Sequence, residues 1–486
     1  MGTSNITSDA SAAYAECFSS ARFSDLNDAA IDVAKKSIID TVGVSLAATT
    51  LNPDAARLAA IVGGFGAQGG CRILGFGGRA AAPLAAWVNG GMAHALDFDD
   101  IAYDAFAHPS AAVVPAMFAV AELVGDVHGE DFITALALAQ DMVVRMSESV
   151  DWKVVAPLPW LPFPLAGTFA AAGACSRLLR LDVSRTQAAI SGALAYAAGA
   201  GELQHGGLRG LYDSWAAQGG VLAALVAREG VAAPAQPLEG TRGFFSQYWQ
   251  GAYDRARLLD GLGRKVRNVR TGYKAWPSCA VTHPAVDAAI RIATHHAIDV
   301  DAIDHVEVRV SAAAWPQCHP LDEKRKPSTV MDAKFSIPFT VAIALSTGNV
   351  TLDDFSPQRL RDAGVLSLAQ RVTPLQDPTL QGRRGVDPCV VSVAMKSGEV
   401  HSTRTDAVYG HEDNPMSMAA IESKFADCAR YAVVPPGAAA VEAFVSDVKR
   451  LEELDDAGQL LGLLEPRVAR NPARRSMETA EMRETS

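Results

Sequence analysis

Apolar residues recur at helical spacing through most of the first 260 residues of this 486-residue chain. Residues 24–50 show the pattern clearly, with polar residues where the helix would begin. Several later segments are rich in alanine around almost their whole circumference, which is typical of helices buried inside a bundle. The pattern therefore predicts a large all-helical domain. Its helices are expected over residues 24–50, 54–62, 81–98, 111–126, 131–149, 165–180, 185–201 and 214–229.

The pattern changes to short strands among helices from about residue 263. Valines alternate with charged residues in DHVEVRVSA (304–312), which is the period-2 signature of a half-buried strand. Residues 388–408 indicate two further strands joined by a Ser-Gly turn. Helical spacing returns between these strands, at 284–296 and 332–346. The segment is therefore expected to form a smaller α+β domain.

The last part of the chain is helical again, from about residue 417 to residue 464. We therefore expect a mainly α protein whose large helical domain is built from both chain ends, residues 1–262 and 411–470. A smaller α+β lid domain, residues 263–410, is inserted between them. Residues 471–486 are polar and are expected to be a disordered tail.

The composition excludes several classes of function. Hydrophobic residues make up 49% of the chain, and the net charge of −11 argues against a broad nucleic-acid surface. Polar and small residues interrupt every apolar run before it reaches the roughly 18 residues of a membrane span. Seven dispersed cysteines without a CxxC pair are typical of reduced thiols. We expect a cytoplasmic protein that binds neither nucleic acid nor a membrane.

Two short motifs do not carry the chemistry that their residue types suggest. GFGAQG (64–69) matches GxGxxG, but a helical pattern precedes it where the dinucleotide fingerprint needs a strand. Cys279 lies four residues before His283, and Cys318 lies beside His319. Neither pair is completed to the four ligands of a structural zinc site.

Carboxylates and imidazoles crowd together in AHALDFDDIAYDAFAHPS (93–110). Burying such groups is costly unless they pair with one another or do chemistry. An Mg²⁺ or Ca²⁺ site is one alternative, but the EF-hand spacing is absent, and a helix would place Asp99 on a different face from its neighbours. We expect no metal here. The residues concerned are His94, Asp97, Asp99, Asp100, Asp104 and His108.

His108 and Lys274 are the strongest acid/base candidates. His108 precedes Pro109 at an expected helix start, and a neutral histidine near a carboxylate is a good general base. Lys274 ends a run of five basic residues that begins at Arg264, and aromatic residues flank it. A partly buried lysine can pair with a substrate carboxylate or donate a proton. The earlier members of this run are expected to form a solvated strand face.

The chain resembles the MmgE/PrpD family, which includes 2-methylcitrate dehydratases, cis-aconitate decarboxylases and iminodisuccinate epimerases. The matching motifs follow one another in the same order over most of the chain. This resemblance implies a cofactor-free homodimer with a large helical domain and a smaller α+β lid. The motifs are NGGMAHALDFDD (89–100), HPSAAVVPA (108–116), YKAWPSCAVTHPAVDAA (273–289), DAKFSIPFTVAIAL (332–345), NPMS (414–417) and KFADCA (424–429).

The same resemblance implies a set of site residues. His108 is expected to act as general base, Lys274 to hold developing charge or return a proton, and Asp97 to orient the site. Asp99, Asp100 and Asp104 are expected to be structural or capping residues. Substrate binding is expected from Arg209, His283, Tyr273 and Lys334.

This sequence also departs from the family at several positions. Ile101 or a neighbour stands where many members have a threonine, Phe339 replaces a tyrosine, and residues 159–169 lack a motif histidine. Arg209 replaces a lysine, and Asp213 falls near the place of another histidine. Arginine binds a carboxylate in a bidentate manner but does not donate a proton at neutral pH. One acid/base group of the family is therefore expected to be a pure binding group here.

These residues favour a lyase of the 2-methylcitrate dehydratase type that acts on a small di- or tricarboxylate. Three alternatives stay open. An epimerase or isomerase of the iminodisuccinate epimerase type would remove and return a proton at one stereocentre. A decarboxylase would act on an unsaturated tricarboxylate of the cis-aconitate type. A dimer without catalytic activity would only bind carboxylates.

Overall fold

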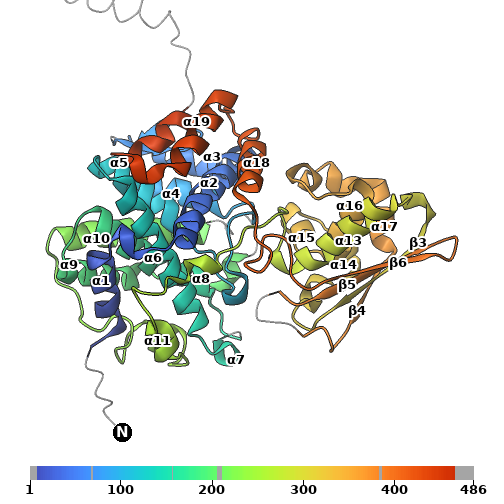
Figure 1. Ribbon diagram of the computed structural model, residues 1–486, viewed down its shortest axis with the longest axis horizontal. Coiled ribbons are helices and arrows are strands. Elements are labelled where there is room, and N and C mark those ends of the chain that lie inside the picture. The colour runs from blue at the N-terminus through green and yellow to red at the C-terminus, as the bar shows by residue number, and fades with distance from the viewer. Residues whose placement is uncertain (1–7, 67–68, 156, 205–210, 382–385, 466–486) are drawn as a thin grey trace, which may run out of the picture.

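The computed structural model is mainly α and shows a larger helical body beside a smaller body that contains a sheet (Figure 1). The residues that it describes are 8–66, 69–155, 157–204, 211–381 and 386–465. Arg209 and the tail at 471–486 lie outside them.

The larger body contains most of the chain's helices and one short hairpin. Each predicted helical segment of this body contains a helix, and the hairpin lies in the glycine-rich segment after the third helix. The helices are α1 (Ala10–Ser20), α2 (Asp28–Leu51), α3 (Pro53–Gly64), α4 (Ala82–Ala93), α5 (Val113–Val124), α6 (Gly129–Glu148), α7 (Trp152–Val155), α8 (Pro162–Leu178), α9 (Val183–Ala193), α10 (Leu211–Arg228), α11 (Phe244–Tyr248), α12 (Arg255–Leu259), α18 (Met418–Ala429) and α19 (Ala438–Lys449). The hairpin pairs β1 (Cys71–Ile73) with β2 (Gly78–Ala80).

One hydrophobic core joins residues from both ends of the described chain. Helix α10 packs against α4, α8 and α9, and α18 packs against α2. Ile38 and Phe169 share this core with Phe425 and Leu461 from the C-terminal segment. Alanine and glycine at helix contacts allow such close packing; Gly220 of α10, for example, lies directly against Ala171 of α8.

The smaller body contains a four-stranded sheet in the order β4-β3-β5-β6. β3 and β4 are parallel, whereas β5 pairs antiparallel with β3 and with β6. Helix α13 packs on β5 and β6, and α16 packs on α13 and β4. The elements are α13 (His283–His296), α14 (Leu321–Arg325), α15 (Val330–Lys334), α16 (Ile337–Thr347), α17 (Ala363–Gln370), β3 (Ile303–Val310), β4 (Val372–Gln376), β5 (Cys389–Met395) and β6 (Val400–Thr405).

The predicted strands of this body are confirmed. Val306, Val308 and Val310 of β3 are buried in a second hydrophobic core under the helices. The turn between β5 and β6 contains Gly398 at a φ of 92°, a conformation that glycine adopts without steric cost.

Several predicted helices end earlier than the apolar pattern indicates. Helix α4 ends at Ala93 instead of continuing to residue 98, and Asp97, within the expected span, adopts a left-handed conformation with a φ of 53° that an α-helix does not contain. The helix expected over 332–346 is divided, since Ser336 caps a new helix that has Pro338 in its first turn.

Two other predicted helical segments are also shorter or interrupted. The segment expected over 185–201 forms α9 only to Ala193 and continues as a short 3-10 turn. The C-terminal segment is divided into α18, α19 and a 3-10 helix at Ala457–Leu464.

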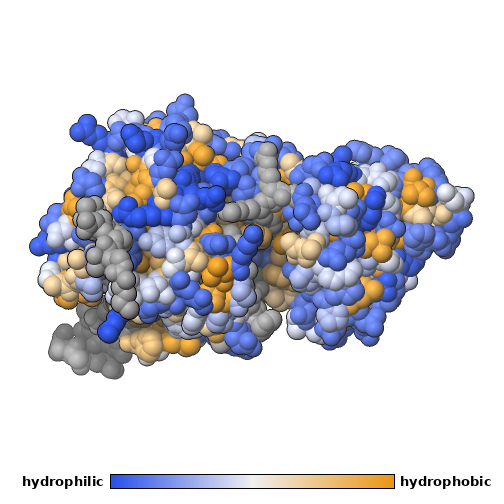
Figure 2. All heavy atoms as spheres, turned by 90° about the horizontal axis from the view of Figure 1, so that it is seen from below, coloured by the Kyte–Doolittle hydropathy of each residue, from blue (hydrophilic) through white to orange (hydrophobic). Residues whose placement is uncertain are grey.

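On the face seen in Figure 2, hydrophilic residues cover much of both bodies and hydrophobic residues form separate small groups among them. Among the described residues, no helix is both long enough and apolar enough to cross a membrane.

Candidate active site

The candidate site is built around the loop of residues 94–100, which connects α4 to the chain segment between the two cores. Every residue of this loop is buried. Phe98 belongs to the core of the larger body, whereas Ile101 belongs to the core of the smaller body. Ile101 pairs with Gly272 through two backbone hydrogen bonds of 2.9 and 2.7 Å. This pairing brings the loop beside the segment that carries Lys274.

Asp99 lies between two histidines at the centre of the site. Its carboxylate is 3.0 Å from His94 Nδ1 and 2.8 Å from His108 Nδ1, and its side chain is completely buried. The two imidazole rings meet edge to face with centroids 4.3 Å apart. Asp99 is thus a shared hydrogen-bond acceptor for both rings.

The electrostatics of this cluster fix its charge state. Burial alone would raise the pKa of the Asp99 carboxyl, but His108 and His94 outweigh it and hold that pKa well below its usual range. Burial lowers the pKa of His94 to about 4, against the opposing effect of Asp99. At neutral pH an ionised Asp99 therefore faces a neutral His94.

The tautomer of His108 follows from its acceptors. Its Nδ1 lies 2.8 Å from the Asp99 carboxylate and 3.0 Å from the Asp100 carbonyl oxygen. Two acceptors at one ring nitrogen require that this nitrogen carries the hydrogen. Nε2 then holds the lone pair of the neutral ring, which is the form that a general base needs.

Lys274 is paired with Asp97 on the same loop. Its Nζ donates to Asp97 Oδ1 at 2.7 Å and to the Asp97 carbonyl oxygen at 3.0 Å, and its side chain is 1% exposed. An ammonium has three hydrogens, and among the described residues these two acceptors engage two of them. The third can donate to a substrate oxygen.

Aromatic rings form a wall against the two histidines. The Phe163 ring centroid is 5.0 Å from that of His108 and 5.5 Å from that of His94. The ring centroid of Tyr212 is 5.6 Å from that of His94 and 5.4 Å from that of Phe163. Phe163 comes from the segment 159–169, which lacks the family's motif histidine. An apolar ring therefore lies beside His108 in this part of the site.

Other residues expected to bind substrate have partners within the protein. The Tyr273 hydroxyl donates to the Val33 carbonyl oxygen at 2.9 Å and lies 3.2 Å from Ser37 Oγ, so it is directed at α2. The Lys334 ammonium donates to the carbonyl oxygen of Leu96. Both side chains therefore donate hydrogen bonds to backbone carbonyl oxygens of the protein.

His283 is completely buried at the start of α13. Its Nε2 lies 3.1 Å from the Ser278 carbonyl oxygen, and its ring packs edge-on against Trp276. Burial, followed by the charge of Lys274, lowers the pKa of His283 to about 3. It is therefore neutral at physiological pH. Arg209 belongs to residues 205–210, which the structure does not describe.

The three remaining aspartates have different surroundings. Asp100 accepts hydrogen bonds from Ser110 Oγ and Ser37 Oγ at 2.5 and 2.8 Å, and Asp104 pairs with Arg270. Both therefore have partners within the protein, and a structural role for them stays a prediction. Asp99 contacts both histidines, which is not expected from the sequence. A helix continued to residue 98 would place Asp99 on a different face from Asp97. The helical pattern therefore does not predict that Asp99 contacts His94 and His108.

Two groups of side chains have the composition of a metal site. His94, Asp99 and His108 offer donor atoms within 4.8 Å of one another, and so do Asp104, His411 and Glu412. In the first group the donors already satisfy one another at hydrogen-bond distances. In the second the Arg270 guanidinium supplies the positive charge, donating to Asp104 and Glu412.

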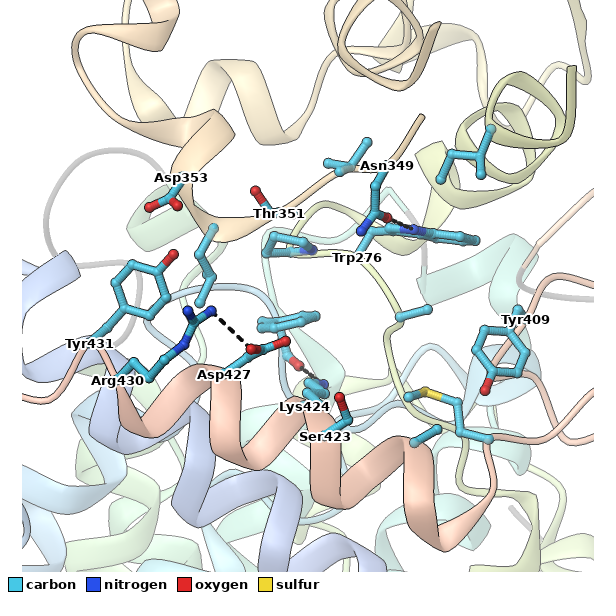
Figure 3. Close-up of a pocket in the computed structure, with 18 residues that line it drawn as sticks. Trp276, Asn349, Thr351, Asp353, Tyr409, Ser423, Lys424, Asp427, Arg430 and Tyr431 are labelled. Atoms are coloured by element: carbon cyan, nitrogen blue, oxygen red, sulfur yellow. Dashed lines mark hydrogen bonds and ion pairs between the residues drawn. The ribbon is translucent and has the colours of Figure 1, made fainter. Parts of the chain in front are cut away.

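A separate cavity of about 470 Å³ lies between α18 and the smaller body (Figure 3). Trp276 and Thr351 face Ser423 and Lys424 across it. Neither of the candidate catalytic side chains, His108 and Lys274, lines this cavity.

Comparison with known proteins gives two adjoining matches that together cover most of the chain. Residues 12–256 match the MmgE/PrpD N-terminal domain, and residues 276–449 match the MmgE/PrpD C-terminal domain. The boundary between them falls close to Lys274.

Curated relatives are similar over most of their length at low identity. The chain is 25% identical over 389 residues to a cis-aconitate decarboxylase of Mus musculus, covering 78% of each chain. It is 26% identical over 399 residues to a cis-aconitate decarboxylase of Homo sapiens, covering 80% of this chain and 81% of the relative. A cis-aconitate decarboxylase of Aspergillus terreus is 26% identical over 328 residues, or 64% and 67% of the two chains.

Proposed function

The chain belongs to the MmgE/PrpD family, and from this premise we propose that it is a lyase acting on a small di- or tricarboxylate. The observation that carries the proposal is the arrangement of the 94–100 loop. Asp99 fixes the tautomer of His108, while two residues earlier Asp97 holds the Lys274 ammonium. One short loop therefore sets both a base and a cation in place.

His108 acts first, as the general base. Its Nε2 removes the proton from a carbon next to a substrate carboxylate, and Asp99 stabilises the imidazolium that forms. General-base catalysis of this kind contributes roughly 10²–10⁴-fold to a rate.

Lys274 stabilises the negative charge that this step creates. As the carbon loses its proton, charge develops on the neighbouring carboxylate oxygens. The hydrogen of Lys274 that does not contact Asp97 donates to one of those oxygens. Because the ammonium is buried, this interaction is stronger than it would be in water.

Elimination of water is the first candidate reaction. The electron pair of the broken C–H bond forms a C=C bond as the C–O bond to a hydroxyl on the next carbon breaks. The protonated His108 returns its proton to the departing hydroxide, so that water leaves and the base is regenerated.

Decarboxylation is the second candidate, and the names of the curated relatives favour it. Here His108 first takes a proton from solvent. The C–C bond to a carboxylate then breaks, carbon dioxide leaves with both oxygens of that carboxylate, and the electron pair left on the carbon takes the proton from His108, which returns to its neutral form. We place elimination first because the acceptors at His108 Nδ1 leave Nε2 of the neutral ring able to remove a proton, whereas decarboxylation needs His108 to be protonated beforehand.

Incubation with small hydroxylated and unsaturated carboxylates, citrate and cis-aconitate among them, in deuterated water separates the reactions. We expect NMR to show an alkene from a hydroxylated substrate. Release of carbon dioxide would establish the second candidate. Solvent exchange without net conversion would identify an epimerase, and a raised melting temperature without any turnover would identify a binding protein.

We further propose that the reaction needs no added cofactor. The acid, base and cationic groups described above are all side chains of this protein. Exhaustive dialysis against a chelator should leave the rate of the active enzyme unchanged. Loss of activity, restored by one divalent ion, would instead assign a metal to His94, Asp99 and His108.

A further inference from the structure

The backbone of the 94–100 loop is held by lysines from three separate segments. The carbonyl oxygen of Leu96 accepts a hydrogen bond from Lys334, and that of Asp97 accepts one from Lys274. The carbonyl oxygen of Phe98 accepts one from Lys424 at 2.6 Å. Three successive carbonyl groups therefore each bind an ammonium, and no helix or strand accounts for this arrangement.

Lys424 is the member of this set that lies outside the chemistry described above. It projects from α18 towards the segment that carries Trp276 (Figure 3), and its side chain is 6% exposed. Its ammonium donates to the carbonyl oxygens of Phe98 and Lys274 and pairs with Asp40 Oδ1 at 2.7 Å. These acceptors use all three of its hydrogens.

Two of the three acceptors of Lys424 belong to the candidate site. One accepting carbonyl belongs to the residue after Asp97, and the other belongs to Lys274 itself. The ammonium also lies 3.8 Å from the centroid of the Phe98 ring, a favourable cation–π distance. Lys424 thus ties together the two chain segments whose side chains form the Lys274–Asp97 pair.

Asp97 needs such support because of its backbone conformation. Its φ of 53° is left-handed, which costs free energy for any residue with a Cβ atom. A loop in this conformation keeps one geometry only if its surroundings enforce it. The ammonium groups bound to consecutive carbonyls supply that constraint.

We propose that Lys424, together with Lys334, is a positioning residue for the active site. The two lysines fix the backbone on either side of Asp97, so that Asp97 meets Lys274 and Asp99 meets His108. Because Lys334 comes from α15 of the smaller body and Lys424 from α18, the site is complete only when both elements are docked on the loop. This inference rests on the proposed function for its kinetic consequence only.

The test uses the full chain with the double substitution Asp40→Asn and Lys424→Met. Changing both partners avoids leaving an unpaired buried charge, which could prevent folding if Lys424 alone were replaced. The matched control is Lys35→Met with Glu452→Gln. Lys35 is likewise buried, donates to the carbonyl oxygen of Lys449 and pairs with Glu452, but contacts no residue of the site.

Amide hydrogen exchange at residues 94–101 measures the constraint without any substrate. We expect the site variant to exchange at least tenfold faster there than the wild type, while the control variant keeps wild-type exchange in this segment. Unchanged exchange in a folded site variant, judged by circular dichroism, would overturn the proposal.

Kinetics then measures the effect on the reaction. A misplaced loop is expected to lower kcat by roughly 10²-fold with little change in KM, whereas the control variant keeps its kcat even where its melting temperature falls. Equal kcat in the site variant and the wild type would also overturn the proposal. If the wild type turns over no carboxylate, the proposed function fails, and the exchange measurement still decides the role of Lys424.

Discussion

A carboxylate that accepts hydrogen bonds from two imidazoles can stabilise a positive charge on either ring. In this protein burial keeps His94 neutral, with a pKa lowered to about 4, so the charge of Asp99 is available mainly to His108. When His108 takes a proton from substrate, the resulting imidazolium faces an ionised partner 2.8 Å away. Asp99 is therefore the residue that we propose to support His108 as the general base.

Replacing Asp99 with asparagine tests this role. The amide can present its NH₂ group to His108 Nδ1, which favours the tautomer with the hydrogen on Nε2 and removes the lone pair of the base. We expect kcat to fall roughly 10²–10⁴-fold. Steady-state kinetics beside a thermal melt separates this loss from unfolding. Activity within threefold of the wild type would assign Asp99 a structural role only.

Lys274 is expected to be equally indispensable for a different reason. In Lys274→Ala the buried Asp97 carboxylate loses its partner and the developing charge loses its hydrogen-bond donor. Turnover should become undetectable while the circular dichroism spectrum stays that of the folded protein. A variant that retains full activity would remove Lys274 from the mechanism.

The surroundings of Asp100 lead to a prediction about stability, not about catalysis. Burial raises its pKa to about 7, so between pH 4 and 7 the folded protein binds a proton that the unfolded chain releases. Its contribution to stability is therefore complete below about pH 4 and is lost as the pH rises to 7. Asp100→Asn resembles the protonated acid, and its free energy of unfolding relative to the wild type should increase over this range.

The increase for Asp100→Asn is expected to be at most about 4 kcal/mol, because each unit of pKa shift corresponds to about 1.4 kcal/mol. Urea unfolding at pH 4.5, 6 and 8 measures it. If the difference in free energy of unfolding between Asp100→Asn and the wild type were the same at all three pH values, a buried, protonated Asp100 would be contradicted.

At the scale of elements, close backbone contact holds the site together. Gly272 pairs with Ile101, and a Cβ atom added to Gly272 would lie 2.2 Å from the carbonyl oxygen of Gly410. That oxygen belongs to backbone and has little room to move. Three segments distant in sequence therefore converge where only glycine fits.

Gly272→Ala should consequently destabilise the protein by roughly 1–3 kcal/mol, as overpacking of a filled core does. Gly437→Ala is the matched control, since a Cβ atom there has no neighbour within 4 Å. Thermal melts of both variants check the prediction. Equal melting temperatures for the two would show that the backbone at Gly272 relaxes without cost.

The apolar pattern predicted the elements far better than it predicted the site. The strand β3 and the alanine-rich helices can be predicted because the pattern of apolar residues in the sequence shows which of their faces are buried. The path of the chain after α4 is not visible in that pattern, because the carbonyl oxygens of Asp97 and Phe98 accept hydrogen bonds from lysines 177 and 326 residues away. His108 and Lys274 could be proposed as site residues from their sequence neighbours, whereas the contacts of Asp99 with both histidines depend on the path of the loop.

At the scale of the molecule, the site lies where two hydrophobic cores meet. Phe98 packs into one core and Ile101 into the other, so the conformation of the loop between them depends on the packing of both cores.

The resemblance of the sequence to its family implies a homodimer. Size-exclusion chromatography with light scattering should give twice the chain mass at micromolar concentration, and a mass of one chain in the active protein would contradict this.

The central claim is that His108 transfers a proton at a carbon next to a substrate carboxylate. The most direct measurement is NMR detection of deuterium at that carbon during turnover in deuterated water, with the wild type and His108→Gln compared at equal concentration. We expect the wild type to catalyse the exchange or loss of that hydrogen, and the variant to do neither while keeping its melting temperature within a few degrees. Wild-type rates in His108→Gln would contradict the claim.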